Sequence, residues 1–403
     1  MRPILSILIP TRNRARYVAY AIQSALGISD SGVEILVSNN CSEDDTRAIC
    51  RSFIDPRLRV FDTDRLLPMH ANYESLIQRA TGEWIYFLGD DDAIMPHAAA
   101  YLRHITLRHP LCEALVTPRA YYFWKNAEDS SGGIAVKCVF ENYERWRDSK
   151  QCLIDLLDCK TNYFSSPQNY SGGFQRRSLI RRVLNSQNGI YYKSVTPDAY
   201  SALMGCLHTY RFLESGIPVA WVGTSDGKER SSDVKSETKD RIQDFFGLHN
   251  EDDLIIHRSL GDLRYYTLPL IFYEAYLSAI PTTSYKELNR DRLLYLLADA
   301  KHVFESTGES QEYLQLLDCL GFDPTEIAKV SRKNKRRQFF ERNRERLWRY
   351  FRKLMFSFRG RPQANQKQWS RHLVSNSYSE FPNILTANAW AQSAYDDFLR
   401  ECI

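Results

Sequence analysis

The first hundred residues alternate between short apolar runs and longer segments with a single apolar face. Strands are predicted at residues 4–9, 34–37, 58–61 and 84–88. Helices are predicted at residues 17–26, 43–53, 72–80 and 96–107. This strand–helix repetition predicts an α/β fold with a mostly parallel sheet and flanking helices on both faces.

The pattern is less regular after residue 110. Helices near 150–159, 176–185 and 198–208 and a strand at 219–222 are predicted, followed by a polar stretch typical of a loop at 223–240. The chain beyond that loop has a mainly helical pattern. We therefore predict an α/β domain, made of two halves, and a mainly helical C-terminal region: 1–225 (1–110 and 111–225) and 226–403.

Polar clusters follow three of the predicted strands, at residues 11–14, 38–40 and 90–92. In an open α/β sheet, ligands bind in the crevice outside the carboxyl ends of the strands. Because all three clusters stand at such ends, we expect them to converge on one binding site.

The last cluster consists of three adjacent carboxylates, Asp90, Asp91 and Asp92. They repel one another, and a divalent cation with oxygen ligands would remove that penalty. Mg²⁺ and Mn²⁺ suit such a site, because Mg²⁺ in proteins is commonly held by one or two carboxylates together with substrate phosphates. The alternative is an acidic turn before a helix, where the helix dipole favours negative charge.

Composition narrows the class of protein. Of the 403 residues, 43% are hydrophobic and 25% charged, which is ordinary for a globular chain and excludes wholesale disorder. The formal net charge of +4 is too small for a polycation that binds nucleic acid along its whole surface. The nine cysteines form no CxxC pair, which disfavours structural zinc and disulfides and favours free thiols in a reducing cytosol.

No apolar stretch reaches the roughly 18 residues of a membrane-spanning helix. Residues 339–358 instead have an amphipathic pattern with an apolar stripe opposite a basic face. Such a helix either lies on an anionic membrane surface or packs on its own domain. Nucleic acid is a third, less favoured partner, because no recognised binding module accompanies the charge.

Three segments together resemble the glycosyltransferase family 2 with its GT-A fold. They are residues 6–14 (SILIPTRNR), 34–42 (EILVSNNCS) and 82–92 (GEWIYFLGDDD), in the same order and spacing as in that family. The resemblance covers the first 110 residues well and continues more weakly to about residue 225.

The resemblance implies roles for particular residues. Asp90 and Asp92 match the DxD motif that binds the metal and the donor diphosphate, and Asp91 between them would contact the donor sugar or ribose. A set of loop residues would bind the nucleotide sugar: Pro10, Thr11, Arg14, Asn39, Asn40 and Asn72. Asn39 stands where many members have an Asp that accepts the uracil N–H; its amide oxygen also accepts hydrogen bonds, so a UDP-sugar is favoured while TDP- and GDP-sugars stay open.

Residues 196–200 (TPDAY) resemble the acidic motif that opens the acceptor-side helix of the family. Family 2 enzymes invert the anomeric centre, and this implies that Asp198 is the general base that deprotonates the acceptor hydroxyl. The structural alternative is a helix start capped by Thr196 with Pro197 in the first turn. Two further residues, His208 and Asp226, are weaker candidates for an additional metal ligand.

The implied function is glycosyl transfer from a nucleoside-diphosphate sugar to a glycan or lipid-linked acceptor in cell-surface polysaccharide synthesis. We expect a cytoplasmic location, peripheral at the inner face of the plasma membrane if residues 339–358 bind lipid. Two alternatives stay open: a nucleotide-sugar-binding scaffold without turnover, and a sugar nucleotidyltransferase. The second normally has a Gly-rich loop after the first strand, and residues 11–16 contain no glycine.

Overall fold

The computed structural model describes residues 2–124, 134–136, 138–157, 160–225 and 379–402, and parts of the segment between 275 and 331. The basic helix predicted at 339–358 and Asp226 lie outside the described residues. Within the described part, no helix combines the length and the apolar character needed to cross a membrane.

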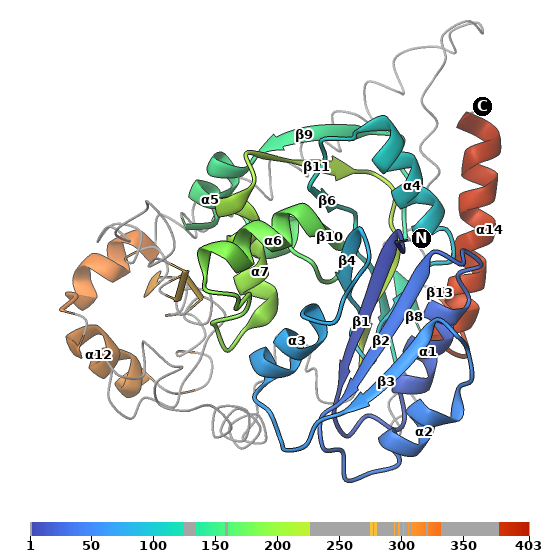
Figure 1. The fold of residues 1–403 in the computed structure, drawn as a ribbon. Coiled ribbons are helices and arrows are strands. Elements are labelled where there is room, and N and C mark those ends of the chain that lie inside the picture. Colours follow the sequence, from blue (N-terminus) through green and yellow to red (C-terminus); the bar gives the residue numbers. More distant parts are fainter. Residues whose placement is uncertain are drawn as a thin grey trace, which may run out of the picture.

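The main sheet has eight strands, and its first four coincide with the strands predicted from the sequence. These parallel strands are, in sheet order, β3 (Leu58–Asp62), β2 (Val33–Asn39), β1 (Leu5–Thr11) and β4 (Trp84–Phe87). The sheet continues with β10 (Gly173–Arg176), β6 (Ala114–Val116), β11 (Arg211–Ser215) and β9 (Glu144–Asp148). Strands β10 and β9 run antiparallel to their neighbours, so the sheet is mostly parallel, as predicted (Figure 1).

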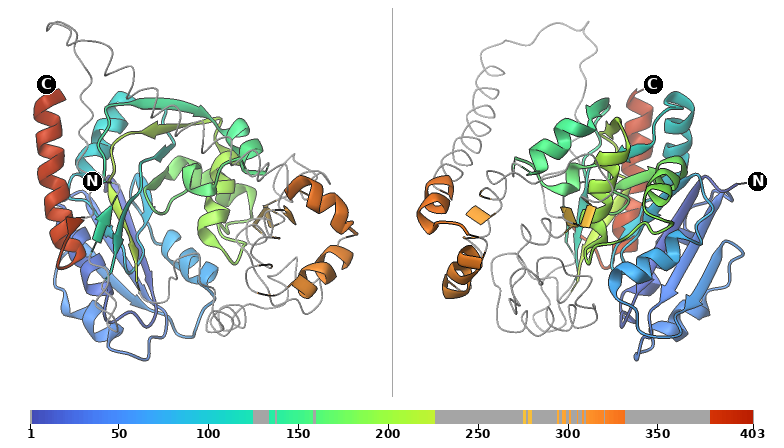
Figure 2. Two further views of the ribbon diagram at one scale, coloured as in Figure 1. Left: turned by 180° about the vertical axis from the view of Figure 1, so that it is seen from behind. Right: turned by 60° about the vertical axis from the view of Figure 1, so that its left-hand side comes forward.

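Helices cover both faces of this sheet (Figures 1 and 2), and the alternation of side chains along β1 explains why. Leu5 and Ile7 belong to one buried core, and Leu8 belongs to the other. The first core includes residues of α1 (Val18–Leu26), α2 (Thr46–Ser52) and α4 (Ala98–Arg108). The second includes α3 (Met69–Ile77), α5 (Ser149–Leu157), α6 (Arg177–Ser186) and α7 (Pro197–His208). The predicted fold class is thereby confirmed.

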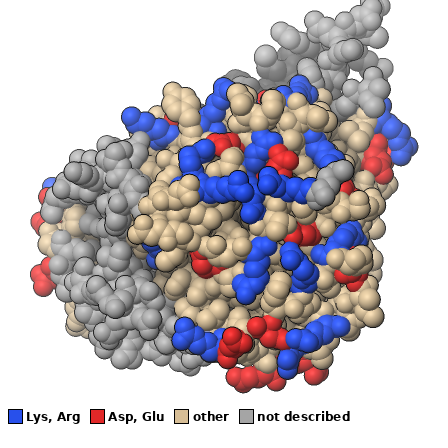
Figure 3. Space-filling view, in the orientation of Figure 1, with Lys and Arg blue, Asp and Glu red and all other residues tan. Residues whose placement is uncertain are grey.

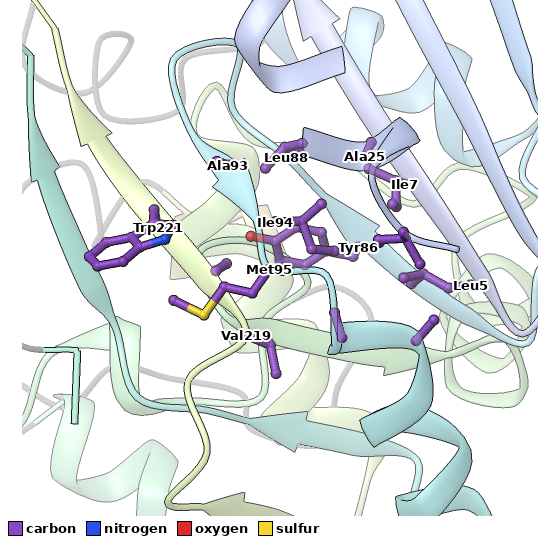
Figure 4. Close-up of a cluster of buried hydrophobic side chains, with 14 of the residues drawn as sticks. Leu5, Ile7, Ala25, Tyr86, Leu88, Ala93, Ile94, Met95, Val219 and Trp221 are labelled. Carbon is purple, nitrogen blue, oxygen red and sulfur yellow. The ribbon is translucent and has the colours of Figure 1, made fainter. Parts of the chain in front are cut away.

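A smaller sheet fixes the acidic turn in place. Its five strands are, in order, β13 (Ser379–Glu380), β8 (Ile134–Val136), β7 (Ala120–Phe123), β12 (Ala220–Thr224) and β5 (Ala93–Ile94). Strand β5 begins directly after the turn at 90–92 and pairs with β12. Leu88 before the turn and Ala93 after it lie in one buried cluster with Tyr86 and Trp221 (Figure 4). The carboxylates are therefore carried by a short, rigid connection between buried residues.

The C-terminal helix α14 (Ile384–Cys402) packs against the same core as the main sheet. Asn388 Nδ2 donates to the backbone oxygen of Ile94 at 2.9 Å, and the ring of Tyr395 stacks on His97 at 3.9 Å. The division predicted at residue 225 assigns this helix to the C-terminal region, yet it braces the strand that follows the acidic turn. Helix α12 (Ser310–Cys319) lies on the far side of the molecule from α14 (Figures 1 and 2).

Candidate active site

Arg14 links the loop after β1 to the acidic turn. Its Nε lies 3.4 Å from Asp90 Oδ1, and its Nη1 donates to Ser225 Oγ at 3.2 Å. Burial by itself would lower the pKa of Arg14, but the carboxylates of Asp90 and Asp91 outweigh it, and the net pKa is raised. Two of the three predicted clusters therefore meet, as the position of their strands implied.

The three carboxylates of the turn have different surroundings. Asp92 is fully buried, and its two oxygens accept backbone N–H groups of Gly223 at 2.7 Å and Gly89 at 3.2 Å. Asp91 is also buried and accepts the Ser225 hydroxyl at 2.6 Å. The side chain of Asp90 keeps 14% of its surface exposed. Asp92 thus ties the turn to β12, whereas Asp90 is the carboxylate that reaches solvent.

Strand β12 approaches the turn so closely that residue 223 must be glycine. A Cβ added to Gly223 would lie 1.8 Å from the backbone oxygen of Asp91. Trp124 Nε1 donates to that same oxygen at 2.8 Å. The backbone of the turn is therefore held from the β7–β12 side, which leaves its other side for a ligand.

Two buried acceptors stand at the carboxyl ends of β1 and β2. Thr11 and Asn39 are partners in the parallel register, and within the described residues neither Thr11 Oγ1 nor Asn39 Oδ1 has a hydrogen-bond partner. Asn39 Nδ2 donates to Asp62 Oδ1 at 2.8 Å, so the amide is oriented with its oxygen unsatisfied. Buried polar atoms without partners are rare and costly, and a ligand bound at this edge of the sheet would satisfy them.

Asp62 is a residue of this region that the sequence interpretation missed. It ends β3, and its Oδ2 lies 3.2 Å from Arg47 Nε and also contacts Arg51. Burial would raise the pKa of Asp62, but the Asn39 amide and the Arg51 guanidinium more than offset this, and its pKa is lowered. Asp62 could have been predicted from the sequence, because it also stands at the carboxyl end of a strand of the parallel sheet.

Two other predicted donor-site residues hold the surrounding loops. Asn40 donates to the backbone oxygen of Leu67 and accepts from its N–H, at 2.8 and 2.9 Å. Asn72 accepts the hydroxyl of Ser38 at 2.6 Å. Pro10 is the β1 residue opposite Ser38. These hydrogen bonds fix the segment around Leu67 and the start of α3 against the carboxyl end of β2.

Asp198 lies in the first turn of α7, where the helix dipole favours a carboxylate. Its Oδ2 accepts the hydroxyl of Tyr163 at 2.6 Å, and its Oδ1 accepts the N–H of Ala199 at 2.9 Å. Thr196 is the residue before the helix, but its side chain makes no capping bond. His208 is at the opposite end of the same helix, with its backbone oxygen accepting from Arg182, so it does not join the site.

Two partly buried tyrosines, Tyr73 and Tyr170, lie within electrostatic range of both Asp198 and the acidic turn. Desolvation is the main reason that the pKa of each hydroxyl is raised, and the carboxylates of Asp198 and Asp91 raise both pKa values further. The hydroxyl of Tyr170 lies against the turn itself, 2.9 Å from where a Cβ on Gly89 would stand. Tyr170 precedes a pair of glycines typical of a loop near a substrate, whereas Tyr73 stands in no local pattern that would mark it.

Within the described residues, no group of three or more His, Cys, Asp or Glu side chains could hold a metal by protein ligands alone. The acidic turn instead offers oxygen ligands beside a guanidinium. This donor set fits Mg²⁺ or Mn²⁺ that shares its coordination shell with phosphate oxygens.

Comparison with known proteins finds a family match over the part of the chain that carries the acidic turn. Residues 6–185 match the family described as Glycosyl transferase family 2. The succinoglycan biosynthesis protein ExoO of Rhizobium meliloti is 33% identical over 94 residues, which cover 23% of this chain and 27% of that protein. A GalNAc(5)-diNAcBac-PP-undecaprenol beta-1,3-glucosyltransferase of Campylobacter jejuni is 31% identical over 103 residues, or 25% of this chain and 33% of that protein. The matched part thus spans about a third or less of each relative.

The crystal structure of S. aureus TarS 1-349 in complex with UDP-GlcNAc is similar at a TM-score of 0.47 and 13% identity, covering 83% of this chain and 92% of that one. The family match includes β1, β2, β4 and the acidic turn, which are the elements that build the crevice. Residues 6–185 of this chain therefore belong to glycosyl transferase family 2.

Proposed function

We propose that this chain is an inverting glycosyltransferase that moves a sugar from a nucleoside-diphosphate sugar to a hydroxyl of a glycan or lipid-linked saccharide. The observation that carries the proposal is the ion pair between Arg14 and Asp90, which joins the loop after β1 to the acidic turn at the edge of the sheet where Asn39 Oδ1 is unsatisfied. Arg14 and the acidic turn would hold the diphosphate, and Asp198 would supply the base for the acceptor.

The nucleotide would lie at the ends of β1 and β2. Asn39 Oδ1 is an unsatisfied acceptor in a fixed orientation, and an N–H of the base would satisfy it. Uracil and thymine both present such a group next to carbonyl oxygens, and guanine presents an N–H as well. We favour UDP-sugars, with TDP- and GDP-sugars as alternatives.

The diphosphate would lie between Arg14 and the acidic turn, with Mn²⁺ or Mg²⁺ held by Asp90 and a second carboxylate. The family resemblance points to Asp92 as that second ligand. Each oxygen of Asp92 accepts one backbone N–H and keeps a further lone pair for a cation, so we propose Asp92 as this ligand, with Asp91 as the alternative. Bound there, the cation would stabilise the negative charge that develops on the leaving diphosphate.

Asp198 would accept the proton of the attacking hydroxyl. As the new bond forms from the acceptor oxygen to the anomeric carbon, the bond from that carbon to the diphosphate oxygen breaks, and the nucleoside diphosphate leaves. General-base assistance is typically worth about 10²–10⁴-fold in rate. Tyr163 is a positioning residue, since its hydroxyl holds one oxygen of Asp198.

A lipid-linked acceptor would bring the protein to the inner face of the plasma membrane, and we propose a cytoplasmic or peripheral location on that basis. The basic segment 339–358 is the candidate contact with anionic lipid. A nucleotide-sugar-binding scaffold remains the alternative if the site binds donor without turnover.

Calorimetric titration of the full chain with UDP, TDP and GDP, each with and without Mn²⁺, tests the proposal. We expect metal-dependent binding of one nucleotide, lost in Asp90→Asn and retained in Arg103→Gln, a control on the exposed Arg103–Asp30 pair. If none of the three binds in the presence of the metal, the proposed donor site is wrong.

A further inference from the structure

A cavity of about 430 Å³ opens at Phe164, the residue after Tyr163, whose hydroxyl binds Asp198. The end of β6, the strands β9 and β11, and the short helix η1 (Tyr163–Ser165) contribute its walls. Among the lining residues, those with charged or aromatic side chains include Arg119, Arg145, Arg147, Glu214 and Phe164.

The cavity carries an excess of positive charge. Among the described residues that line it, Glu214 is the one acid, and it binds Arg145 at 2.6 Å and Arg147 at 2.5 Å through separate oxygens. The guanidinium of Arg119 lies 3.7 Å from the ring centroid of Phe164. No carboxylate pairs with it among the described residues, and its Nε is buried without a hydrogen-bond partner there. Three guanidinium groups and one carboxylate thus line the cavity, and Arg119 is the guanidinium that pairs with no carboxylate among the described residues.

Figure 3 shows Lys and Arg side chains, with Asp and Glu among them, across the upper part of the face on which Figure 1 places β9 and β11.

Two contacts connect the cavity to the reacting groups. Phe164 lines the cavity, and the preceding residue, Tyr163, binds Asp198. On the other wall, Thr117 Oγ1 donates to the backbone oxygen of Gly172, two residues after Tyr170. A ligand in the cavity would therefore contact Phe164, the neighbour of the residue that holds the proposed base.

We propose that this cavity binds an oxyanionic group of the acceptor sugar, a carboxylate or a phosphate ester. Guanidinium groups bind both through paired N–H donors, and the aromatic residues Tyr121 and Tyr143 line the same cavity, where a sugar ring could pack. The acceptor would thus be an acidic saccharide. This inference rests on the proposed transfer reaction, but the binding site can be measured separately.

The test is binding of small acceptor probes to the full chain saturated with UDP and Mn²⁺, measured by ligand-observed NMR titration. Methyl glucuronide and glucose 6-phosphate are the anionic probes, and methyl glucoside is the neutral match. We expect each anionic sugar that fits to bind roughly tenfold or more tightly than the glucoside, because hydrogen bonds to charged groups are the stronger ones. Preference between the two probes identifies the source of the oxyanion.

Arg119→Gln should weaken anionic-probe binding roughly tenfold and leave UDP binding unchanged, with Arg103→Gln as the surface control. Arg145→Gln, on a side chain that is 60% exposed, gives the same test with little risk to folding. Equal binding of neutral and anionic sugars, or unchanged affinity in both variants, overturns the inference. Probe binding without any nucleotide binding would leave the cavity assignment standing and refute the transferase proposal instead.

Discussion

The hydroxyl of Tyr163 donates to Asp198 Oδ2 at 2.6 Å, although the two residues are 35 positions apart and belong to different elements. The ring of Tyr163 is partly buried and packs against the core that contains α7. Burial, followed by the charge of Asp198, raises the pKa of this hydroxyl, which keeps it a donor at neutral pH. One oxygen of Asp198 is thus held in place.

Tyr163→Phe should therefore lower kcat and leave the KM for the donor sugar unchanged. Loss of one hydrogen bond to a carboxylate should raise the activation free energy by about 1–2 kcal/mol, which corresponds to roughly 10-fold in rate. Release of nucleoside diphosphate from a UDP-sugar in the presence of acceptor measures both parameters. Asp198→Asn should cost about 10²-fold or more.

Tyr210→Phe is the matched control, because Tyr210 is 86% exposed. It should behave as the parent protein does. Full activity in Asp198→Asn would show that another group takes the proton.

Asp92→Asn and Asp90→Asn should differ in their effects on stability. In Asp92→Asn the new amide N–H₂ faces one of the two backbone N–H groups, which removes a buried acceptor and costs about 1–3 kcal/mol of unfolding free energy. In Asp90→Asn the partly exposed side chain changes stability little but weakens metal-dependent nucleotide binding. Urea unfolding and calorimetry on both variants separate these effects; a stable Asp92→Asn that has lost only metal binding would contradict the role of Asp92 in tying the turn to β12.

The sequence predicts long periodic elements well, because their pattern reports burial directly. The helix predicted at 198–208 is α7, at Pro197–His208. Strand β9 was missed because its sequence, ERWRD, has no apolar alternation; pairing with β11 makes it a strand. The packing of α14 on the sheet was missed for a related reason, since contacts between distant segments leave no local pattern.

The same distinction applies to the site. The convergence of Arg14 and the acidic turn follows from the strand order alone. The different surroundings of Asp90 and Asp92 could not be predicted in this way. The burial of Asp92 depends on its contact with Gly223, which is more than a hundred residues away in the sequence. Asn40 and Asn72 lie near the crevice, as expected, but their partners are loop and strand atoms that only the folded chain brings together.

Asn39→Asp tests the geometry of the base pocket. The new carboxylate would lie beside Asp62, whose oxygen is now 2.8 Å from Asn39 Nδ2, so the two would share a proton and one pKa would rise. A raised folded-state pKa means that stability is retained at low pH and lost as pH rises through that value. The loss is about 1.4 kcal/mol for each unit of the shift.

Thermal unfolding between pH 4 and 8 measures this dependence. The double variant with Asp62→Asn restores the complementary pair and should regain stability at neutral pH. A pH-independent Asn39→Asp would mean that the two side chains separate readily and that the amide orientation is not fixed.

His97 should make the stability of the whole chain depend on pH. Burial lowers its pKa from 6.5 to about 4, and the hydrogen bond to the Pro218 oxygen at 2.9 Å offsets this only in part. As pH falls, the unfolded chain therefore takes up a proton on His97 before the folded chain does. The folded state keeps its full stability above pH 6.5, and the free energy of unfolding decreases as pH falls toward 4. The full loss amounts to about 3 kcal/mol.

Urea midpoints measured from pH 7 to pH 4 should fall steeply in the parent protein and less in His97→Gln, which keeps an N–H donor but does not titrate. Because the His97 ring stacks on Tyr395 of α14, protonation should also loosen that helix from the core. Trp390 lies on α14 and packs against the core, and its fluorescence should change in the same pH range. Parallel pH profiles for the parent and His97→Gln would place the acid sensitivity elsewhere.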